Sequence, residues 1–249
     1  MEWQAEGTVL ARRPHGESAV ILDVLTARHG RHAGLVPGGV SRTRAAMLQP
    51  GARLDLRWRA RRDDQLGHFA VEPVRLRAGI MGDPLALAGL NAICALLVFA
   101  LPERDPHPDL FFRTEALLDA IETGSDWGVA YLQWEMRLLD EMGFGLDLSS
   151  CAVTGATEGL AYVSPRSGRA VSLAGAGEWA DRLLPLPPLL GRTGDDRPEG
   201  RARGLTQGLA ITGHFLRSRI AAELVGRPLP AARDRLVTRL LPPPAGTDY

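Results

Sequence analysis

Charged and apolar residues alternate strictly along one short segment of the sequence, residues 53–59. The charged positions are Arg53, Asp55, Arg57 and Arg59, and the apolar positions between them are Leu54, Leu56 and Trp58. A period of two predicts a β-strand with one buried face and one solvent face. Guanidinium groups along the solvent face can follow the phosphate backbone of a nucleic acid. Trp58 belongs to the opposite face, so we expect it in the core and not as a stacking platform.

Further arginines stand close to this segment, before it in the loop after Pro37-Gly38-Gly39 and directly behind it. We take the whole set as candidate nucleic-acid-binding residues: Arg42, Arg44, Arg53, Arg57, Arg59, Arg61 and Arg62. Arginine suits this role because its planar group makes bidentate contacts to phosphate and stacks on bases. Alternating arginines are also an ordinary solubilising exterior, and the pattern alone leaves both interpretations open.

Glycines near residue 175 could suggest a cofactor site. Gly175, Gly177 and Ala180 match the spacing of a dinucleotide fingerprint. However, a helix starting there would stop at Pro185, and no βαβ unit surrounds it. The glycines therefore indicate a helix entry, and we expect no cofactor. The sequence has no G-x-S-x-G motif, and nothing in it requires an enzyme; a small-molecule enzyme using the Gly175 region is the weakest alternative.

The histidines and cysteines do not predict a metal site. His29 and His32 flank one turn, and we expect them to be exposed because a metal would need more convergent ligands. The two cysteines, Cys94 and Cys151, are too few for a disulfide framework or a four-cysteine site.

The net charge is zero, with 29 arginines, 29 acidic residues and no lysine among 249 residues. The absence of lysine excludes Schiff-base chemistry and a P-loop lysine. A zero sum argues against a nucleic-acid-binding protein, but the charge is unevenly distributed. Residues 1–80 carry a net charge of +5, residues 81–145 of −8 and residues 146–249 of +3, which suggests separate surfaces with separate partners.

The first 80 residues have the pattern of short strands separated by turns. The predicted strands cover 7–11, 18–26, 31–36, 53–59 and 67–74, with a short helix over 43–48. Five strands whose edges need closure predict a barrel of the oligonucleotide-binding (OB) type.

From residue 84 on, apolar residues recur at helical spacing. The predicted helices cover 85–101, 110–122 with Asp109 as N-cap, 126–142, 205–225 and 230–241, with an irregular stretch at 146–175, a linker at 185–203 and a tail at 242–249. The uncharged stretch 85–101 touches the lower length limit of a membrane span, but Asn91 and the flanking prolines favour a buried helix. The fold class is therefore α+β, with an OB domain over residues 1–80 and a helical domain over 81–249. No export signal is recognisable, and we expect a cytoplasmic protein with no membrane partner.

Several blocks of sequence, in order along nearly the whole chain, match a known pattern. They are ARRPHGES at 11–18, an apolar strand to Thr26, VPGGVSR at 36–42, LLDEMGFGLDLSSCAVTG at 138–155, YVSPRSGRAV at 162–171 and GRPL at 226–229. Together they resemble the bacterial RecO family of DNA repair proteins, and the block at 138–171 is the most specific.

The resemblance implies an OB barrel followed by a helical region with a small zinc-ribbon-like insert at about 146–175. It implies a recombination mediator and not an enzyme. The implied partners are single- and double-stranded DNA, the protein RecR and the C-terminal tail of the single-strand-binding protein SSB. Such a protein anneals complementary strands and helps RecA displace SSB, and it is nucleoid-associated when engaged on DNA.

The insert departs from the pattern of many relatives, which place two C-x-x-C pairs there. Here Cys151 remains, the second position of its pair is Thr154, and the later pair would fall near Ser172 and Gly175. One thiolate does not make a four-ligand zinc site, so we expect a metal-free insert held by packing and hydrogen bonds. In the loop after Val36 the family's lysines are absent, which leaves Arg42 and Arg44 as the candidates to contact phosphate.

An acidic, apolar-ended SSB tail needs an apolar pocket with some arginine. Residues 81–145 offer apolar helices and the arginines Arg104, Arg113 and Arg137, of which Arg137 is our candidate. A rival function is a protein–protein adaptor whose barrel docks a protein partner and not DNA, since a fold does not fix a function.

Overall fold

The computed structural model describes residues 1–62, 64–190 and 197–241. Its elements are, in chain order, β1 (Glu2–His15), β2 (Ala19–Thr26), β3 (Gly30–Val36), α1 (Arg42–Met47), β4 (Arg53–Arg59), β5 (His68–Arg75), η1 (Ala78–Gly82), α2 (Pro84–Ala100), α3 (Pro108–Glu122), α4 (Gly128–Glu141), β6 (Leu160–Val163), β7 (Ala170–Ser172), α5 (Leu173–Ala176), η2 (Gly177–Arg182), β8 (Leu184–Pro185), η3 (Pro188–Leu190), α6 (Pro198–Phe215), the π-helix η4 (Leu216–Val225) and α7 (Ala231–Leu240).

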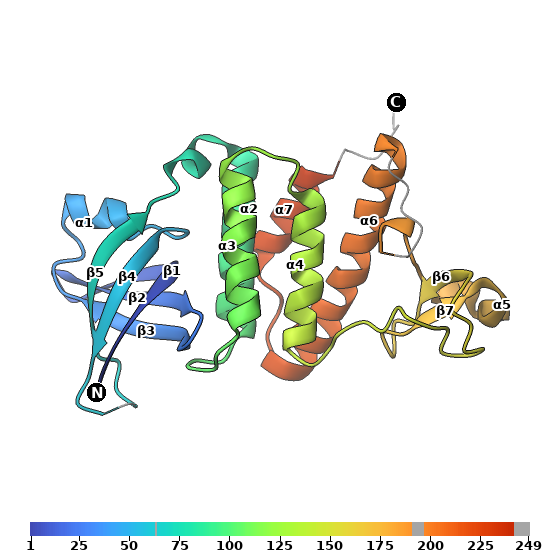
Figure 1. Cartoon of the computed structure of the whole chain (residues 1–249), viewed down its shortest axis with the longest axis horizontal. Coiled ribbons are helices and arrows are strands. Elements are labelled where there is room, and N and C mark those ends of the chain that lie inside the picture. Colours follow the sequence, from blue (N-terminus) through green and yellow to red (C-terminus); the bar gives the residue numbers. More distant parts are fainter. Residues whose placement is uncertain (63, 191–196, 242–249) are drawn as a thin grey trace. The chain divides into compact units, whose positions relative to one another are not determined.

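The N-terminal strands close into a five-stranded barrel with the order β1-β2-β3-β5-β4 (Figure 1). Neighbouring strands are antiparallel except β3 and β5, which meet in parallel at Leu35 and His68. The helix α1 connects β3 to β4. This arrangement confirms the predicted OB-type barrel followed by a helical region.

The strand β1 is longer than the predicted segment 7–11 because it serves two neighbours. It pairs with β4 through residues 2–8 and with β2 through residues 7–15, with an irregularity between Val9 and Ala11. Only the middle of the strand, residues 7–10, is fully buried. The apolar pattern therefore revealed the middle of the strand and not its two exposed ends.

The alternation of β4 is confirmed. Leu54, Leu56 and Trp58 are at most 1% exposed and pack in the barrel core, while Arg57 and Arg59 are exposed. Each buried apolar side chain of this size contributes about 1.5–3 kcal/mol to the free energy of unfolding. The buried face thus fixes the register that points the arginines outward.

The helix predicted at 85–101 is confirmed as the buried helix α2. Asp83 caps it, because its carboxylate accepts hydrogen bonds from the backbone amides of Leu85 (2.7 Å) and Ala86 (3.3 Å). The helix packs against β1, with the Cys94 sulfur 4.0 Å from the carbonyl oxygen of Val9. Among the described residues, none of the helices has the length and apolar character needed to cross a bilayer.

Two helix starts differ from the prediction in the same way. The helix α3 begins at Pro108 after His107, so the assignment of Asp109 as N-cap is wrong; Asp109 lies in the first turn. The helix α6 begins at Pro198, seven residues before the predicted start at Leu205. Proline is favoured at the first helical position, because its fixed φ suits the helix and its missing N–H has no intrahelical partner there.

The predicted linker at 185–203 is consequently wrong over residues 198–203, which are helical. Residues 191–196 and the predicted tail 242–249 lie outside the described residues. The predicted irregular stretch 146–175 contains the strands β6 and β7, which form a small sheet with β8 in the order β7-β6-β8.

The chain divides into two compact units. The first comprises residues 1–127 with 230–236, and the second comprises 128–229 with the segment after 236, so that α7 contributes to both. In the second unit α4 packs on α6, where the Thr212 hydroxyl donates a hydrogen bond of 2.5 Å to Glu135. The proposed functional division at residue 80 stays a prediction.

Candidate nucleic-acid interface

The arginines predicted to bind nucleic acid lie along the barrel from one end to the other. Arg42 and Arg44 are on α1, at one end of the barrel, whereas Arg59, Arg61 and Arg62 are at the end of β4 and in the loop that follows it (Figure 1). The strand between them spans roughly 20 Å at about 3.4 Å per residue. The predicted arginines therefore form two groups, one at each end of the barrel, and the outer face of β4 with Arg53 and Arg57 lies between them.

On the outer face of β4 the arginines are paired with carboxylates of β1. Arg53 lies 2.6 Å from Glu6 and Arg59 lies 2.9 Å from Glu2. Arg57 lies 3.9 Å from Glu2. Exposed pairs of this kind contribute little to stability, but a phosphate has to compete with them for the guanidinium groups.

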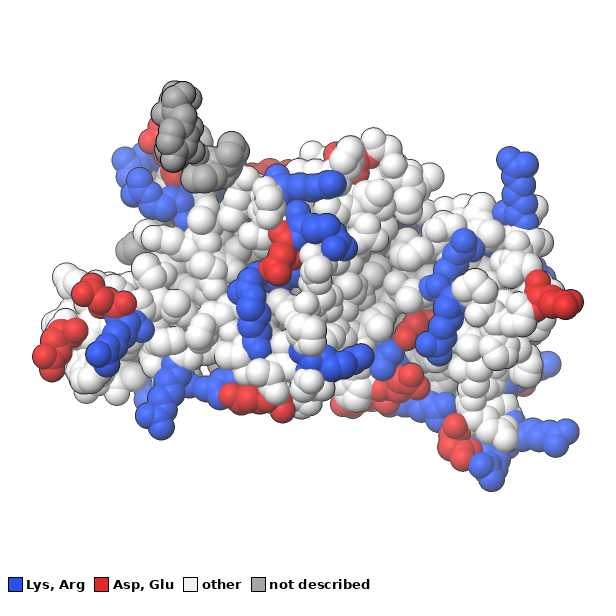
Figure 2. All heavy atoms as spheres, turned by 180° about the vertical axis from the view of Figure 1, so that it is seen from behind, with Lys and Arg blue, Asp and Glu red and all other residues white. Residues whose placement is uncertain are grey.

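The remaining predicted arginines differ in their partners. Arg44 donates a hydrogen bond of 2.7 Å to the carbonyl oxygen of Pro37, and Arg62 lies 2.7 Å from Asp64. The side chains of Arg42 and Arg61 make no hydrogen bond or ion pair with other described residues. On the barrel, at the right of Figure 2, arginine side chains stand apart with carboxylates and uncharged surface between them.

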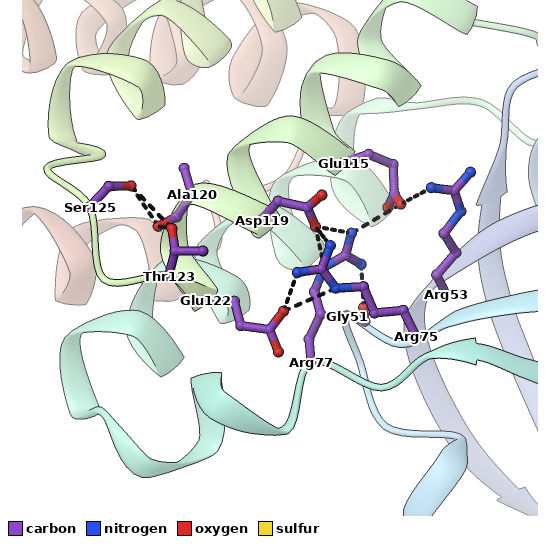
Figure 3. A network of polar contacts seen from close by, with 10 residues as sticks. All are labelled: Gly51, Arg53, Arg75, Arg77, Glu115, Asp119, Ala120, Glu122, Thr123 and Ser125. Atoms are coloured by element: carbon purple, nitrogen blue, oxygen red, sulfur yellow. Dashed lines mark hydrogen bonds and ion pairs between the residues drawn. The ribbon is translucent and has the colours of Figure 1, made fainter.

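Arg53 also belongs to a polar network around the buried Arg77, which we call the Arg77 clamp (Figure 3). Its charged members are Arg53, Arg75, Arg77, Glu115, Asp119 and Glu122. The Arg77 side chain is 1% exposed and lies 3.0 Å from Glu115 and 2.7 Å from Asp119. It also donates a hydrogen bond of 2.8 Å to the carbonyl oxygen of Gly51. The clamp joins the barrel and the chain behind β5 to α3.

Sequence reasoning missed this clamp because acidic residues on an amphipathic helix are usually a solvated face. The available signal was the spacing of the three carboxylates, at i, i+4 and i+7 of α3, which places them on one side of the helix. Arg53 lies 3.2 Å from Glu115 in addition to its contact with Glu6. The Arg53 guanidinium group therefore already forms ion pairs with two carboxylates of the protein, those of Glu6 and Glu115.

At the end of the barrel opposite α1 lies a pocket of 280 Å³, which we call the barrel mouth. It is lined by Trp3, Arg28, His29, His32, Trp58 and Arg104. The Trp3 ring stacks on His29, with centroids 4.1 Å apart and planes at 13°, and lies 5.8 Å from Trp58 with planes at 19°. Burial, together with the neighbouring charge of Arg28, lowers the pKa of His29, so the imidazole favours the neutral form.

The prediction of two exposed turn histidines is wrong for His32, which is 4% exposed. Its position on β3 points the ring inward, where it packs edge-on against Trp58 at 4.9 Å. His29 is half-buried in the turn between β2 and β3. Of the neighbours His68 and Phe69, His68 is the exposed one and Phe69 is 2% exposed.

A second, wider pocket of 560 Å³ lies at the same end of the barrel. It is lined by Met1, Glu2, Arg59, Ala60, Arg61, Gln65, Gly67 and His68. Arg104 of the barrel mouth donates a hydrogen bond of 2.9 Å to the carbonyl oxygen of Gln65, which connects the two pockets. The predicted residues Arg59 and Arg61 thus meet the unpredicted Arg28 and Arg104 around one end of the barrel.

The insert in the second unit brings together Cys151, Thr154, Ser172 and Gly175, the positions that the sequence comparison with the family pattern singled out. The Cys151 sulfur, in a residue 1% exposed, accepts hydrogen bonds from the backbone amide (3.2 Å) and hydroxyl (3.3 Å) of Ser172 and from the amide of Thr154 (3.4 Å). A Cβ atom on Gly175 would lie 2.9 Å from the sulfur. Burial opposes ionisation of the thiol, but the hydrogen bonds from Ser172 and Thr154 outweigh it and lower the pKa to about 6.

Hydrogen-bond donors therefore occupy the place of further thiolates around Cys151. Among the described residues no group of three or more histidine, cysteine or acidic side chains is arranged to hold a metal ion. Metal-free packing of the insert stays a prediction.

Arg137, the candidate for the SSB tail, lies on α4 in the second unit. Its guanidinium group pairs with Asp140 at 2.6 Å and with Glu141 at 2.5 Å, and its side chain is 33% exposed. A carboxylate from a partner would have to share or displace these contacts.

The fold and this surface define a class of protein in which an OB barrel with basic and aromatic residues at one end precedes a helical region. The family model "Recombination protein O N terminal" matches residues 1–77, and "Recombination protein O C terminal" matches residues 81–228. The chain belongs to the RecO family, as its sequence blocks predicted.

Curated relatives agree over almost the full length. The chain is 64% identical over 240 residues to the DNA repair protein RecO of Paracoccus denitrificans, with 96% of each chain covered. It is 59% identical over 241 residues to that of Cereibacter sphaeroides, covering 96% of this chain and 98% of the relative. It is 57% identical over 238 residues to that of Roseobacter denitrificans, covering 95% and 97%.

Proposed function

We propose that this chain is a recombination mediator without a catalytic site. It binds single- and double-stranded DNA through its barrel, anneals complementary strands and, with RecR, helps to load RecA on SSB-coated single-stranded DNA. The observation that carries the proposal is the basic end of the barrel, where Arg59 and Arg61 meet Arg28 and Arg104 beside stacked aromatic rings. Membership in a family whose relatives are named DNA repair proteins supports it.

Binding of single-stranded DNA at a series of salt concentrations tests the electrostatic part of the proposal. If about five phosphates are neutralised, the logarithm of the affinity should fall with the logarithm of the salt concentration at a slope of about −3.5. An affinity that does not change with salt would contradict it. Annealing of complementary strands coated with SSB, with and without RecR, then tests the mediator activity.

A second candidate function is a protein–protein adaptor whose barrel docks a protein. The paired outer face of β4 favours this alternative, because alternating charges such as Arg53 with Glu6 and Arg59 with Glu2 suit a complementary protein surface as well as a phosphate backbone. A gel-shift experiment with single-stranded DNA at two salt concentrations separates the two functions. Salt-sensitive retardation supports DNA binding, and no retardation at low salt supports the adaptor.

We also propose Arg137 as a contact for the C-terminal tail of SSB. Because Asp140 and Glu141 already pair with Arg137, they should weaken the attraction between its guanidinium group and the carboxylates of the tail. An Arg137→Ala variant should bind a tail peptide more weakly, by fluorescence anisotropy. Unchanged peptide affinity would remove Arg137 from the interface.

A further inference from the structure

We propose that the barrel mouth is a stacking pocket for one unstacked base of single-stranded DNA, with Arg28 and Arg104 holding the adjacent phosphates. The inference rests on the proposed DNA binding of the barrel and adds to it a defined base-binding position. It involves Trp3, His29, Arg28 and Arg104, none of which belongs to the arginine set that the sequence predicts.

The aromatic side chains of the mouth form a column of nearly parallel rings. Trp58 lies at its base, 1% exposed, with its indole N–H donating 3.0 Å to the carbonyl oxygen of Leu66. Trp3 stacks above it and His29 stacks on Trp3, with interplanar angles of 19° and 13°. The column ends at His29, which is half-buried, so a further flat ring can extend it. Stacking of this kind accepts every base, because each base has a π-face.

The two arginines at the mouth supply positive charge beside the column. Arg28 is exposed and makes no hydrogen bond or ion pair with other described residues. Arg104 approaches from the segment between α2 and α3 and lines the same pocket. Rings select a flat aromatic group and guanidinium groups select an anion, and single-stranded DNA offers both in each nucleotide.

The backbone that carries Arg104 is held in an unusual conformation. Arg104 has a φ of +66°, in the left-handed region that non-glycine residues rarely adopt. Its amide donates a hydrogen bond of 2.7 Å to the carbonyl oxygen of Arg31 on β3. Gly30 permits this contact, since a Cβ there would lie 2.1 Å from the carbonyl oxygen of Asp105. Strained residues held by their surroundings cluster at binding sites, and this one places a cation at the mouth.

The dimensions of the mouth suit a single base. Its volume of 280 Å³ lies just below the range of small-molecule pockets, about 300–1,000 Å³. The neighbouring 560 Å³ pocket with Arg59 and Arg61 continues from it by way of Gln65. A single strand with one base bound in the mouth can therefore place its next phosphates beside Arg59 and Arg61.

The experiment compares binding of a thymine oligonucleotide with binding of an abasic oligonucleotide of the same length and charge. The wild-type chain should bind the thymine oligonucleotide about tenfold more tightly, within the range measured for stacking of one base. Trp3→Ala and His29→Ala should abolish this preference, and Trp3→Phe should keep most of it. Arg28→Ala should weaken binding of both oligonucleotides equally, because it acts on the phosphates.

A matched control is Trp179→Ala on η2, where an exposed tryptophan also packs with an arginine, Arg182 at 4.9 Å. This variant should keep the preference. If Trp3→Ala fails to fold, as judged by thermal melting, the half-buried His29 provides the test. Tight, salt-sensitive binding of both oligonucleotides with equal affinity would overturn the stacking pocket and leave the proposed function standing. No binding of either would overturn both.

Discussion

The Arg77 clamp and the barrel mouth are two groups of arginines in the same unit, and they differ in their surroundings. In the clamp, Arg77 is 1% exposed and lies within 3.0 Å of carboxylates of α3. In the mouth, Arg28 and Arg104 lie beside aromatic rings. The comparison teaches that the arginines of one unit can be divided between holding the fold and facing a partner.

The largest expected effect comes from breaking the clamp. Arg77→Met leaves Glu115 and Asp119 without their buried partner and should lower the free energy of unfolding by about 3–5 kcal/mol in urea titrations. The control Arg113→Met removes an exposed pair with Asp109 and should cost less than about 1 kcal/mol. The affinity of folded Arg77→Met for single-stranded DNA should equal that of wild type. If folded Arg77→Met loses affinity for single-stranded DNA, the clamp also contributes to DNA binding and the proposed separation of roles between clamp and mouth is wrong.

The next effect comes from the mouth. Arg28→Ala combined with Arg104→Ala should make the salt dependence of single-stranded DNA binding shallower by about 1.4, since each phosphate contact contributes about 0.7 to the slope. The free energy of unfolding should change less than in Arg77→Met, because neither arginine forms an ion pair with a carboxylate of the Arg77 clamp. An unchanged slope would place the phosphate contacts elsewhere.

A smaller effect is expected on the outer face of β4. Arg59→Ala should change the salt slope by less than about 0.7, because Glu2 at 2.9 Å already offsets its charge. Glu2→Gln removes this competing carboxylate and should raise the affinity for single-stranded DNA in the same titration. If Glu2→Gln weakens DNA binding, the carboxylate helps the interface instead of competing with it.

The smallest effect concerns Cys151 and appears only as a function of pH. Because hydrogen bonds lower its pKa to about 6, the thiolate stabilises the folded state fully above about pH 8.5, the usual thiol value, and this contribution is lost as pH falls through about 6. The stability difference between wild type and Cys151→Ser should therefore grow as pH rises from 6 to 8.5. A difference that stays constant with pH would mean that the buried sulfur remains a neutral thiol. DNA affinity should not change.

The sequence predicted the barrel well because its signals are local. The alternation of β4 and the turns between strands determine which residues are buried, and the apolar run of α2 marks a buried helix. The start of α3 was misplaced because Asp109 was taken as its N-cap, whereas Pro108 opens the helix. The start of α6 was misplaced because residues 185–203 were interpreted as a linker, whereas Pro198 opens the helix. Local patterns therefore predicted the helices and strands but misplaced some of their ends.

The interface was predicted only in part because its other half comes from distant segments. Trp3, His29 and Arg104 belong to three separate parts of the chain, and the closed barrel with the segment after α2 brings them together. No spacing in the sequence relates Arg104 to Arg28. The clamp was missed for the same reason, since Arg77 and Glu115 lie 38 residues apart.

The most direct test of the barrel mouth as the site of single-stranded DNA binding is photocrosslinking with an oligonucleotide that carries 5-iodouracil, followed by mass spectrometry of the crosslinked peptides. Crosslinks to Trp3 or His29, lost in the combined Arg28→Ala and Arg104→Ala variant, are the predicted result. Crosslinks confined to other aromatic residues, such as Trp179 on η2, would contradict the account.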